Sequence, residues 1–187
     1  MSLVLVKETG LGLSTANSYA TAADGDSYHE GHAYPSGWTS KTTAQKEAAL
    51  VMATRVIDAY VQFGGRKTTD GQALQWPRCG CPNPDAPGGG LVLRFLGSVS
   101  ARCWDSTVIP PMLVAATCEQ ARCLLGNDLT GPPEGEGKKS MHVGDVVMVY
   151  DVLRPPGVLS RVTAALLAKL GVVMKDGGSF CLTLARG

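Results

Sequence analysis

The stretch that decides the fold runs from Ala48 to Gly80 and reads AALVMATRVIDAYVQFGGRKTTDGQALQWPRCG. Its first half repeats apolar residues at three- and four-residue steps, which predicts an amphipathic helix with Thr43 as its N-cap. The glycine pair Gly64-Gly65 is expected to end this helix. The apolar arc is too broad for packing against one neighbour. We therefore expect the helix to lie at the centre of a bundle or against another subunit.

The stretch closes on Trp76-Pro77-Arg78, for which two interpretations are open. In the structural one, the tryptophan anchors a loop in the core, the proline fixes its direction, and the arginine caps a helix end or pairs with a carboxylate. A catalytic role would need a base or nucleophile alongside, and none stands beside the tripeptide. We predict that Trp76, Pro77 and Arg78 form a structural motif.

Three more helices are predicted on either side of this stretch. Thr21 and Asp24 have the spacing of a capping box and open a helix over about 22–32. Pro110-Pro111 opens the next, because proline is tolerated in a first turn, and that helix runs to Gly126. The last is expected from 155 to 171, with one apolar stripe made by Val158, Leu159, Val162, Leu166 and Leu170.

Short β-strands complete the expected fold. They are predicted at 2–6, at 91–96, as a strand or hairpin over 141–152 and in a hairpin over 172–186. The fold class is therefore expected to be mainly α, a helical bundle of about four helices with short β-hairpins. Residues 1–187 are interpreted as a single domain, with a loop insertion at about 81–104 and a C-terminal helix plus hairpin at about 156–187. A chain of 187 residues suffices for one core.

Charge and aromatic content disfavour a dedicated nucleic-acid-binding protein. The chain has 17 basic and 16 acidic residues, a net charge of +1, so no strong attraction to phosphate is expected. Aromatic residues make up only 6%, which is few for a protein that stacks single-stranded bases. No apolar run approaches the roughly 18 residues of a membrane span, and the first residues lack a signal-peptide pattern. The chain is expected to remain where it is made.

Six cysteines raise the questions of metal binding and nucleophilic catalysis. Cys79, Cys81 and Cys103 could supply three thiolates to zinc, but the two-residue gap and second pair of a zinc ribbon are missing. Isolated thiols in a reducing cytoplasm are the favoured interpretation. Cys118 and Cys123 lie five apart on a predicted helix and do not share a face. A cysteine nucleophile beside a histidine remains an open alternative, which thiol alkylation would test.

Other motifs of catalytic chemistry are incomplete. His29-Glu30-Gly31-His32 has its histidines three apart, whereas a zinc-protease helix needs four, so surface histidines near a helix end are expected. The run 64–69, GGRKTT, resembles the end of a phosphate-binding loop but follows a helix and lacks the required glycines, so we expect a solvated turn. Gly10-Leu11-Gly12 is a weak signal. We predict a protein that is not an enzyme, with no catalytic residue, metal or cofactor.

The order of several short segments is more specific than any one of them. The segments are Ala16-Asn17-Ser18-Tyr19, Trp38, 48–50, Ile57-Asp58, 72–78, Ile109-Pro110, 115–121, Val143-Gly144 and Val149-Tyr150. This order resembles a tailed-bacteriophage family labelled DnaT-like single-stranded-DNA-binding proteins, which is similar to the head-tail connector (adaptor) proteins of phage necks. The resemblance covers nearly the whole chain, most strongly from about Asn17 to Gly80 and from Ile109 to Tyr150.

The resemblance implies a structural virion protein made in the bacterial host cytoplasm and incorporated at the neck. Copies would form a homo-oligomeric ring, matching a twelvefold portal, and would contact the portal protein and a head-closure or tail protein, with no membrane partner. Double-stranded genomic DNA would pass through the channel. Candidate channel or partner contacts are Arg66, Lys67, Lys138 and Lys139. The chief alternative is a single-stranded-DNA-binding module, which would show a basic stripe with interleaved aromatics.

Overall fold

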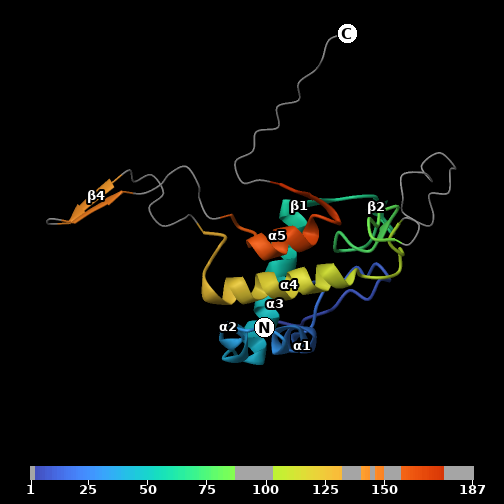
Figure 1. The fold of residues 1–187 in the computed structure, drawn as a ribbon. Helices are drawn as coiled ribbons and strands as arrows, with labels where there is room; N and C mark the ends of the chain where they lie inside the picture. Colours follow the sequence, from blue (N-terminus) through green and yellow to red (C-terminus); the bar gives the residue numbers. More distant parts are fainter. Residues whose placement is uncertain (1–2, 87–102, 132–139, 144–145, 150–156, 175–187) are drawn as a thin grey trace, which may run out of the picture.

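The computed structural model describes residues 3–86, 103–131, 140–143, 146–149 and 157–174. These parts contain five helices and three two-stranded antiparallel sheets (Figure 1). The fold is thus a mixed α/β one in which helices predominate, rather than the bundle of about four helices that the sequence predicted. The helices are α1 (Ala22–Glu30), α2 (Ser36–Thr39), α3 (Thr43–Tyr60), α4 (Pro111–Gly126) and α5 (Arg161–Leu167). The strands are β1 (Val61–Phe63), β2 (Arg66–Lys67), β3 (Arg78–Cys79), β4 (Ser140–Val143), β5 (Val146–Val149) and β6 (Gly171–Val173).

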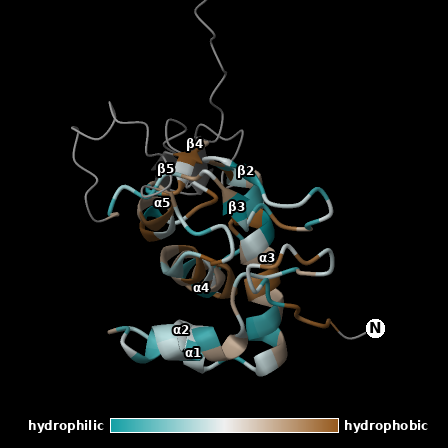
Figure 2. Ribbon diagram, turned by 90° about the vertical axis from the view of Figure 1, so that its right-hand side faces the viewer, coloured by the Kyte–Doolittle hydropathy of each residue, from teal (hydrophilic) through white to brown (hydrophobic). Residues whose placement is uncertain are grey.

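The helices are arranged in layers. Helices α1 and α2 lie at one end of the fold, α4 crosses the middle, and α5 lies at the other end beside β1 (Figures 1 and 2). Helix α4 contacts α1, α2, α3 and α5. Helix α3 is buried along most of its length through Leu50, Val51, Ala53, Val56 and Ile57. Its broad apolar arc is therefore used inside the chain, as expected for a central helix.

Helix α3 begins and ends near the predicted positions, but a strand, not the glycine pair, follows its last residue. The N-cap is Thr42, one residue before the expected Thr43, and it forms a capping box with Gln45. The helix stops at Tyr60, and strand β1 intervenes before the glycine pair at 64–65. Strand β1 pairs with β6, with Val61 opposite Val173 and Phe63 opposite Gly171. The prediction that the glycines end the helix was wrong because this distant strand extends the chain first.

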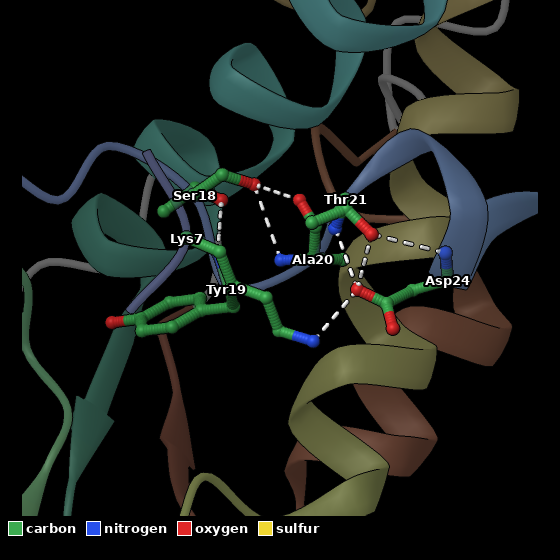
Figure 3. A network of polar contacts seen from close by, with 7 residues as sticks. Lys7, Ser18, Tyr19, Ala20, Thr21 and Asp24 are labelled. Carbon is green, nitrogen blue, oxygen red and sulfur yellow. Dashed lines mark hydrogen bonds and ion pairs between the residues drawn. The ribbon is translucent and has the colours of Figure 1, made fainter. Parts of the chain in front are cut away.

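The N-terminal segment is held to α1 by a polar network (Figure 3). Thr21 and Asp24 form the predicted capping box, and the Lys7 ammonium reaches the Asp24 carboxylate at 2.7 Å. Ser18 hydrogen-bonds both backbone groups of Ala20. No strand forms over 3–6; an isolated bridge joins Lys7 to Ser18 instead. The network orients the start of α1 against the segment before it.

The later elements follow the sequence in part. Helix α4 begins with Pro111 in its first turn, as predicted. Strands β4 and β5 form the predicted hairpin around 144–145. Helix α5 starts later than expected, at Arg161 after the cap Ser160. Of the predicted apolar stripe, Leu159, Leu166 and Leu170 pack into the core around Trp76, whereas Val162 is exposed, so the stripe was wrong at Val162.

The region after Gly171 differs from the expected hairpin over 172–186. Residues 171–173 form β6 and pair with β1, and 175–187 lie outside the described residues. Most of the insertion, with its expected strand at 91–96, also lies outside them. The flanks of the insertion meet, because Pro82 bridges Cys103 and the Trp104 N–H donates to the Cys81 carbonyl at 2.9 Å. Among the described helices, none is both long and apolar enough to cross a bilayer.

The buried side chains form two clusters. The Trp76 cluster joins large side chains from α3, β1, α4, α5 and the loops around them, including Tyr19, Ile57, Phe63, Trp76, Leu113, Leu167 and Leu170. The Trp38 cluster lies where α1 and α2 meet α3 and α4, and its other buried members are Ala20, Ala49, Leu50, Ala53, Cys118 and Ala121. The first cluster is built from large side chains, the second mostly from small ones around one indole.

Candidate nucleic-acid interface at the β2 turn

The Trp76-Pro77-Arg78 motif forms the base of the site. The Trp76 side chain is fully buried, and the Trp76-Pro77 peptide bond is cis. The Arg78 guanidinium donates to the carbonyl oxygens of Gly64 and Gly65 at 2.6 and 2.7 Å. Arg78 therefore holds the turn before β2 through hydrogen bonds to its backbone, and it caps no helix and pairs with no carboxylate in the described parts.

Strand β2 carries the two cations that the sequence singled out. Arg66 pairs with Cys79 and Lys67 with Arg78 in the β2–β3 ladder. Both side chains are exposed, and neither forms an ion pair with any described residue. The other two candidates, Lys138 and Lys139, lie outside the described residues.

These cations line a cleft of about 450 Å³ with three walls, namely the N-terminal loop, the β2–β3 ladder with the turn after β2, and residues 106–107. The N-terminal loop lies beside the β2 turn, at the right of Figure 1. Hydroxyl and cationic side chains predominate in the lining, and within the part of the chain that the structure describes no carboxylate contributes. The lining residues are Gly10, Leu11, Arg66, Lys67, Thr68, Thr69, Cys79, Ser106 and Thr107.

A buried carboxylate fixes the first wall. Glu8 is fully buried, and its two oxygens accept hydrogen bonds from the backbone N–H groups of Gly10, Gly12 and Leu13 at 2.8–2.9 Å. Gly10 and Gly12 have φ angles of 99° and 72°, which side chains disfavour. A Cβ on Gly10 would also lie 1.8 Å from the Thr107 carbonyl oxygen. The loop thereby presents Leu11 with 73% of its surface exposed at the edge of the cleft.

Acceptor side chains also fix the other two walls. The Gln72 side chain is almost fully buried, and its oxygen accepts from the N–H groups of Thr68 and Thr69 at 3.0 and 3.1 Å. Its amide nitrogen donates to the Leu74 and Pro77 carbonyls. In the third wall, Asp105 accepts from the N–H and hydroxyl of Thr107, both at 2.8 Å, and these bonds lower the pKa of Asp105. The cleft is therefore preorganised.

A second polar group lies close behind this turn. Asp58 accepts hydrogen bonds from the Tyr19 hydroxyl at 2.6 Å and from the Gln75 N–H at 3.0 Å. Burial raises the pKa of Asp58 to about 6, although these hydrogen bonds and the charges of Lys67 and Arg78 act to lower it. The positive charge of Lys67 therefore acts on the buried Asp58 carboxyl as well as on the cleft.

The cysteines do not gather into a metal site in the described parts, where no group of three candidate ligands was found. Cys79 is exposed at the cleft, whereas Cys81 is buried and its thiol lies 3.5 Å from the Leu170 carbonyl oxygen. Burial raises the pKa of the Cys81 thiol. The sequence suggested Cys79, Cys81 and Cys103 as a candidate set of zinc ligands. In the fold, the Cys79 side chain is exposed to solvent and the Cys81 side chain is buried.

The histidine motif also lies elsewhere than expected. His29 is fully buried rather than at the surface, because α2 covers it with the Trp38 indole, whose centroid is 4.9 Å from the imidazole. Its Nε2 lies 3.2 Å from the Cys118 carbonyl oxygen, and burial lowers the pKa of His29. Burial raises the pKa of the Cys118 thiol to about 12. The histidine thus contacts the backbone of Cys118, and the thiol of that residue, with its raised pKa, is protonated at neutral pH and suits packing rather than nucleophilic attack.

Sequence reasoning found Arg66 and Lys67 but missed the rest of the cleft. Glu8 followed by two close glycines was the available signal, since a carboxylate can accept N–H bonds from a glycine turn after it. Ser106 and Thr107 had no such signal, because they reach the cleft only through tertiary packing.

The comparisons with known proteins bear on the N-terminal part. No curated protein and no solved structure matched the chain. A family model did: residues 1–86 match the family described as "Putative DnaT-like ssDNA binding protein". The matched residues include the Glu8 loop, strand β2 and the Trp76-Pro77-Arg78 motif, and therefore two of the three walls of the cleft.

Proposed function

We propose that the protein is a structural subunit of a bacteriophage neck, where copies form a ring that joins the portal to head-closure or tail proteins. Genomic DNA passes through the channel of this ring. The observation that carries the proposal is that two groups of exposed apolar side chains lie at opposite ends of the fold; Leu11 and Val108 are also exposed and belong to neither group.

The first group lies at the α1–α2 end. Tyr34, between α1 and α2, has 77% of its surface exposed, and Leu3 and Val4 are exposed in the N-terminal segment. That segment lies at the same end because Leu5 packs against the Trp38 cluster.

The second group lies at the α5–β6 end. It consists of Val162 on α5, Val172 on β6 and Met174 directly after it, and Val172 has 68% of its surface exposed. A ring with one kind of subunit needs two different, complementary surfaces on each copy. Two apolar groups at opposite ends meet that requirement, whereas a twofold dimer needs only one.

A mixing experiment tests this head-to-tail arrangement. Tyr34→Asp and Val172→Asp each charge one group, and Ala73→Asp is the matched control in an exposed loop outside both. At high protein concentration with chemical cross-linking, we expect the parent and the control to form higher oligomers and each variant alone to stay monomeric. An equal mixture of the two variants should give dimers only, since one intact junction remains. Dimers of a single variant would contradict the ring.

In the virion, the proposal predicts DNA-filled heads that lack tails when the gene is deleted, as seen by electron microscopy. Infectious particles of normal yield from the deletion would contradict it.

A second candidate function is a single-stranded-DNA-binding module, which the family match over residues 1–86 favours. The net charge of +1 instead leads us to expect binding no tighter than the non-specific range of about 10⁻⁴–10⁻⁶ M at physiological salt. Fluorescence anisotropy with a labelled oligonucleotide separates the two, because tight, saturable binding would favour the module.

A further inference from the structure

We propose that the cleft between the Glu8 loop and strand β2 is a binding site for a phosphate ester of a sugar, the chemical unit shared by a nucleic-acid strand and a free nucleotide. This goes beyond the neck-ring proposal and does not depend on it, because the residues involved belong to neither exposed apolar group.

Charge is the first argument. Arg66 and Lys67 stand next to each other in the chain at the cleft and form no ion pair with a described residue. None of the described residues that line the cleft is acidic. The carboxylates that fix the neighbouring walls, Glu8 and Asp105, already accept N–H or O–H donors. Two unpaired cations in a recess attract an anion.

Hydrogen-bonding capacity is the second argument. The hydroxyls of Thr68 and Thr107 are already engaged as donors to Gln72 and Asp105. Those of Thr69 and Ser106 donate to no residue in the described parts of the chain, although both line the cleft. Two hydroxyl donors beside two cations suit a phosphate group, which has several acceptor oxygens.

Size and shape are the third argument. The volume of about 450 Å³ lies in the range of small-molecule sites and exceeds what a bare phosphate needs. Leu11 supplies an exposed apolar surface at the edge, and Glu8 holds the loop that carries it. A sugar attached to the phosphate could pack against this side chain. Because Glu8, Gln72 and Asp105 fix the walls in advance, binding requires little ordering of the protein.

The test uses the full chain and three probes, namely inorganic phosphate, thymidine 5′-monophosphate and a twelve-nucleotide oligothymidylate. Amide NMR shifts of residues 10–12, 66–69 and 106–107 report the site, and anisotropy of the labelled oligonucleotide reports affinity. We expect the nucleotide or the oligonucleotide to shift these three groups together and more strongly than inorganic phosphate at equal phosphate concentration. Shifts from the oligonucleotide alone assign the site to a nucleic-acid strand, and equal shifts from the nucleotide assign it to free nucleotides.

Matched variants decide whether the cleft is responsible. The double variant Arg66→Ala/Lys67→Ala should weaken binding about tenfold and flatten its salt dependence, because two phosphate contacts are lost. Lys41→Ala removes one charge at the α2–α3 turn and should change affinity less than twofold. Leu11→Ala should weaken the nucleotide but leave inorganic phosphate unchanged. Both cations are exposed and form no ion pair with any residue that the structure describes, so melting temperatures should stay within a degree or so of the parent.

The proposal fails if no probe shifts the three groups, if inorganic phosphate shifts them as strongly as the esters, or if the double variant binds like Lys41→Ala. None of these outcomes bears on the ring, whose test uses Tyr34 and Val172.

Discussion

Each core cluster has beside it an ionisable group whose pKa is shifted by burial, a histidine at one and a carboxylate at the other, and the two shifts have opposite consequences. Beside the Trp38 indole, burial lowers the pKa of His29 and favours the neutral imidazole. Beside the Trp76 cluster, burial raises the pKa of Asp58 to about 6 and favours the protonated carboxyl. Acid therefore opposes the packing of one cluster and favours the packing of the other. The same physical cause, loss of water around a charge, acts in both.

The largest effect is expected from breaking the Trp76 cluster. Trp76→Ala removes a fully buried indole that packs edge-to-face with Phe63, and it should lower the free energy of unfolding by about 3–5 kcal/mol. Denaturant unfolding measures this change. A variant that melts like the parent but fails to assemble would make Trp76 an interface residue instead.

The packing of the Trp38 cluster should be disrupted by adding a methyl group where there is no space for one. A Cβ on Gly25 would lie 2.3 Å from the Trp38 ring, and the rigid indole cannot yield without moving His29 or α2. Gly25→Ala should therefore cost about 1–3 kcal/mol of unfolding free energy. Gly31→Ala at the end of the same helix is the control, since a Cβ there meets nothing within 4 Å. Equal stability of the two variants would contradict the tight packing of the indole on α1.

The pH dependence of stability sharpens the comparison. The unfolded chain protonates His29 near pH 6.5 and the folded protein only below that, so this group lowers stability as pH falls below about 6.5. Asp58 binds its proton at about 6 when folded and near 3.8 when unfolded, so its contribution is full below about 3.8 and is lost as pH rises through 6. Between these values the two slopes oppose each other, each by at most about 1.4 kcal/mol per pH unit.

Two variants separate the slopes. In unfolding measured from pH 4 to 7, His29→Gln should gain stability on acidification relative to its value at pH 7, because the Asp58 contribution remains. Asp58→Asn should lose stability on acidification because the His29 contribution remains. Identical profile shapes for the two variants would refute the opposing contributions.

The smallest effect is expected at the polar network that joins the N-terminal segment to the start of α1. The Lys7–Asp24 ion pair is about one-third exposed on each side, so Lys7→Ala should cost only about 0.2–1 kcal/mol (Figure 3). The loss should shrink in molar salt, where the pair is screened. A cost above 2 kcal/mol that salt does not change would mean that Lys7 acts through packing.

The sequence predicted what depends on near neighbours. The Thr21–Asp24 capping box, the proline start of α4 and the pairing of β4 with β5 each follow from residues within a few positions of one another. The burial of His29 was mispredicted, because it depends on α2 and on the Cys118 carbonyl 89 residues away. Strand β1 was missed for the same reason, since its partner lies more than 100 residues further on.

The candidate site divides in the same manner. Arg66 and Lys67 stand out in sequence because they follow a glycine pair, and the structure places them at the cleft. The hydroxyls that face them come from 106–107, whose approach is set by the contact of Gly10 with Thr107. No local pattern carries that contact.

The pairing of β1 with β6 also bears on how the chain folds. Gly64 donates to the Leu170 carbonyl and Met174 to the Tyr60 carbonyl, so the end of α3 is completed by residues from the last part of the described chain. Leu167 and Leu170 likewise fill the Trp76 cluster. On the ribosome, residues 1–86 emerge long before these partners do, and the cluster has to wait with an open side. Contacts between residues so far apart in the sequence form slowly, because closing the long loop between them costs conformational entropy. The incomplete nascent chain therefore exposes the most apolar surface to aggregation or to chaperones.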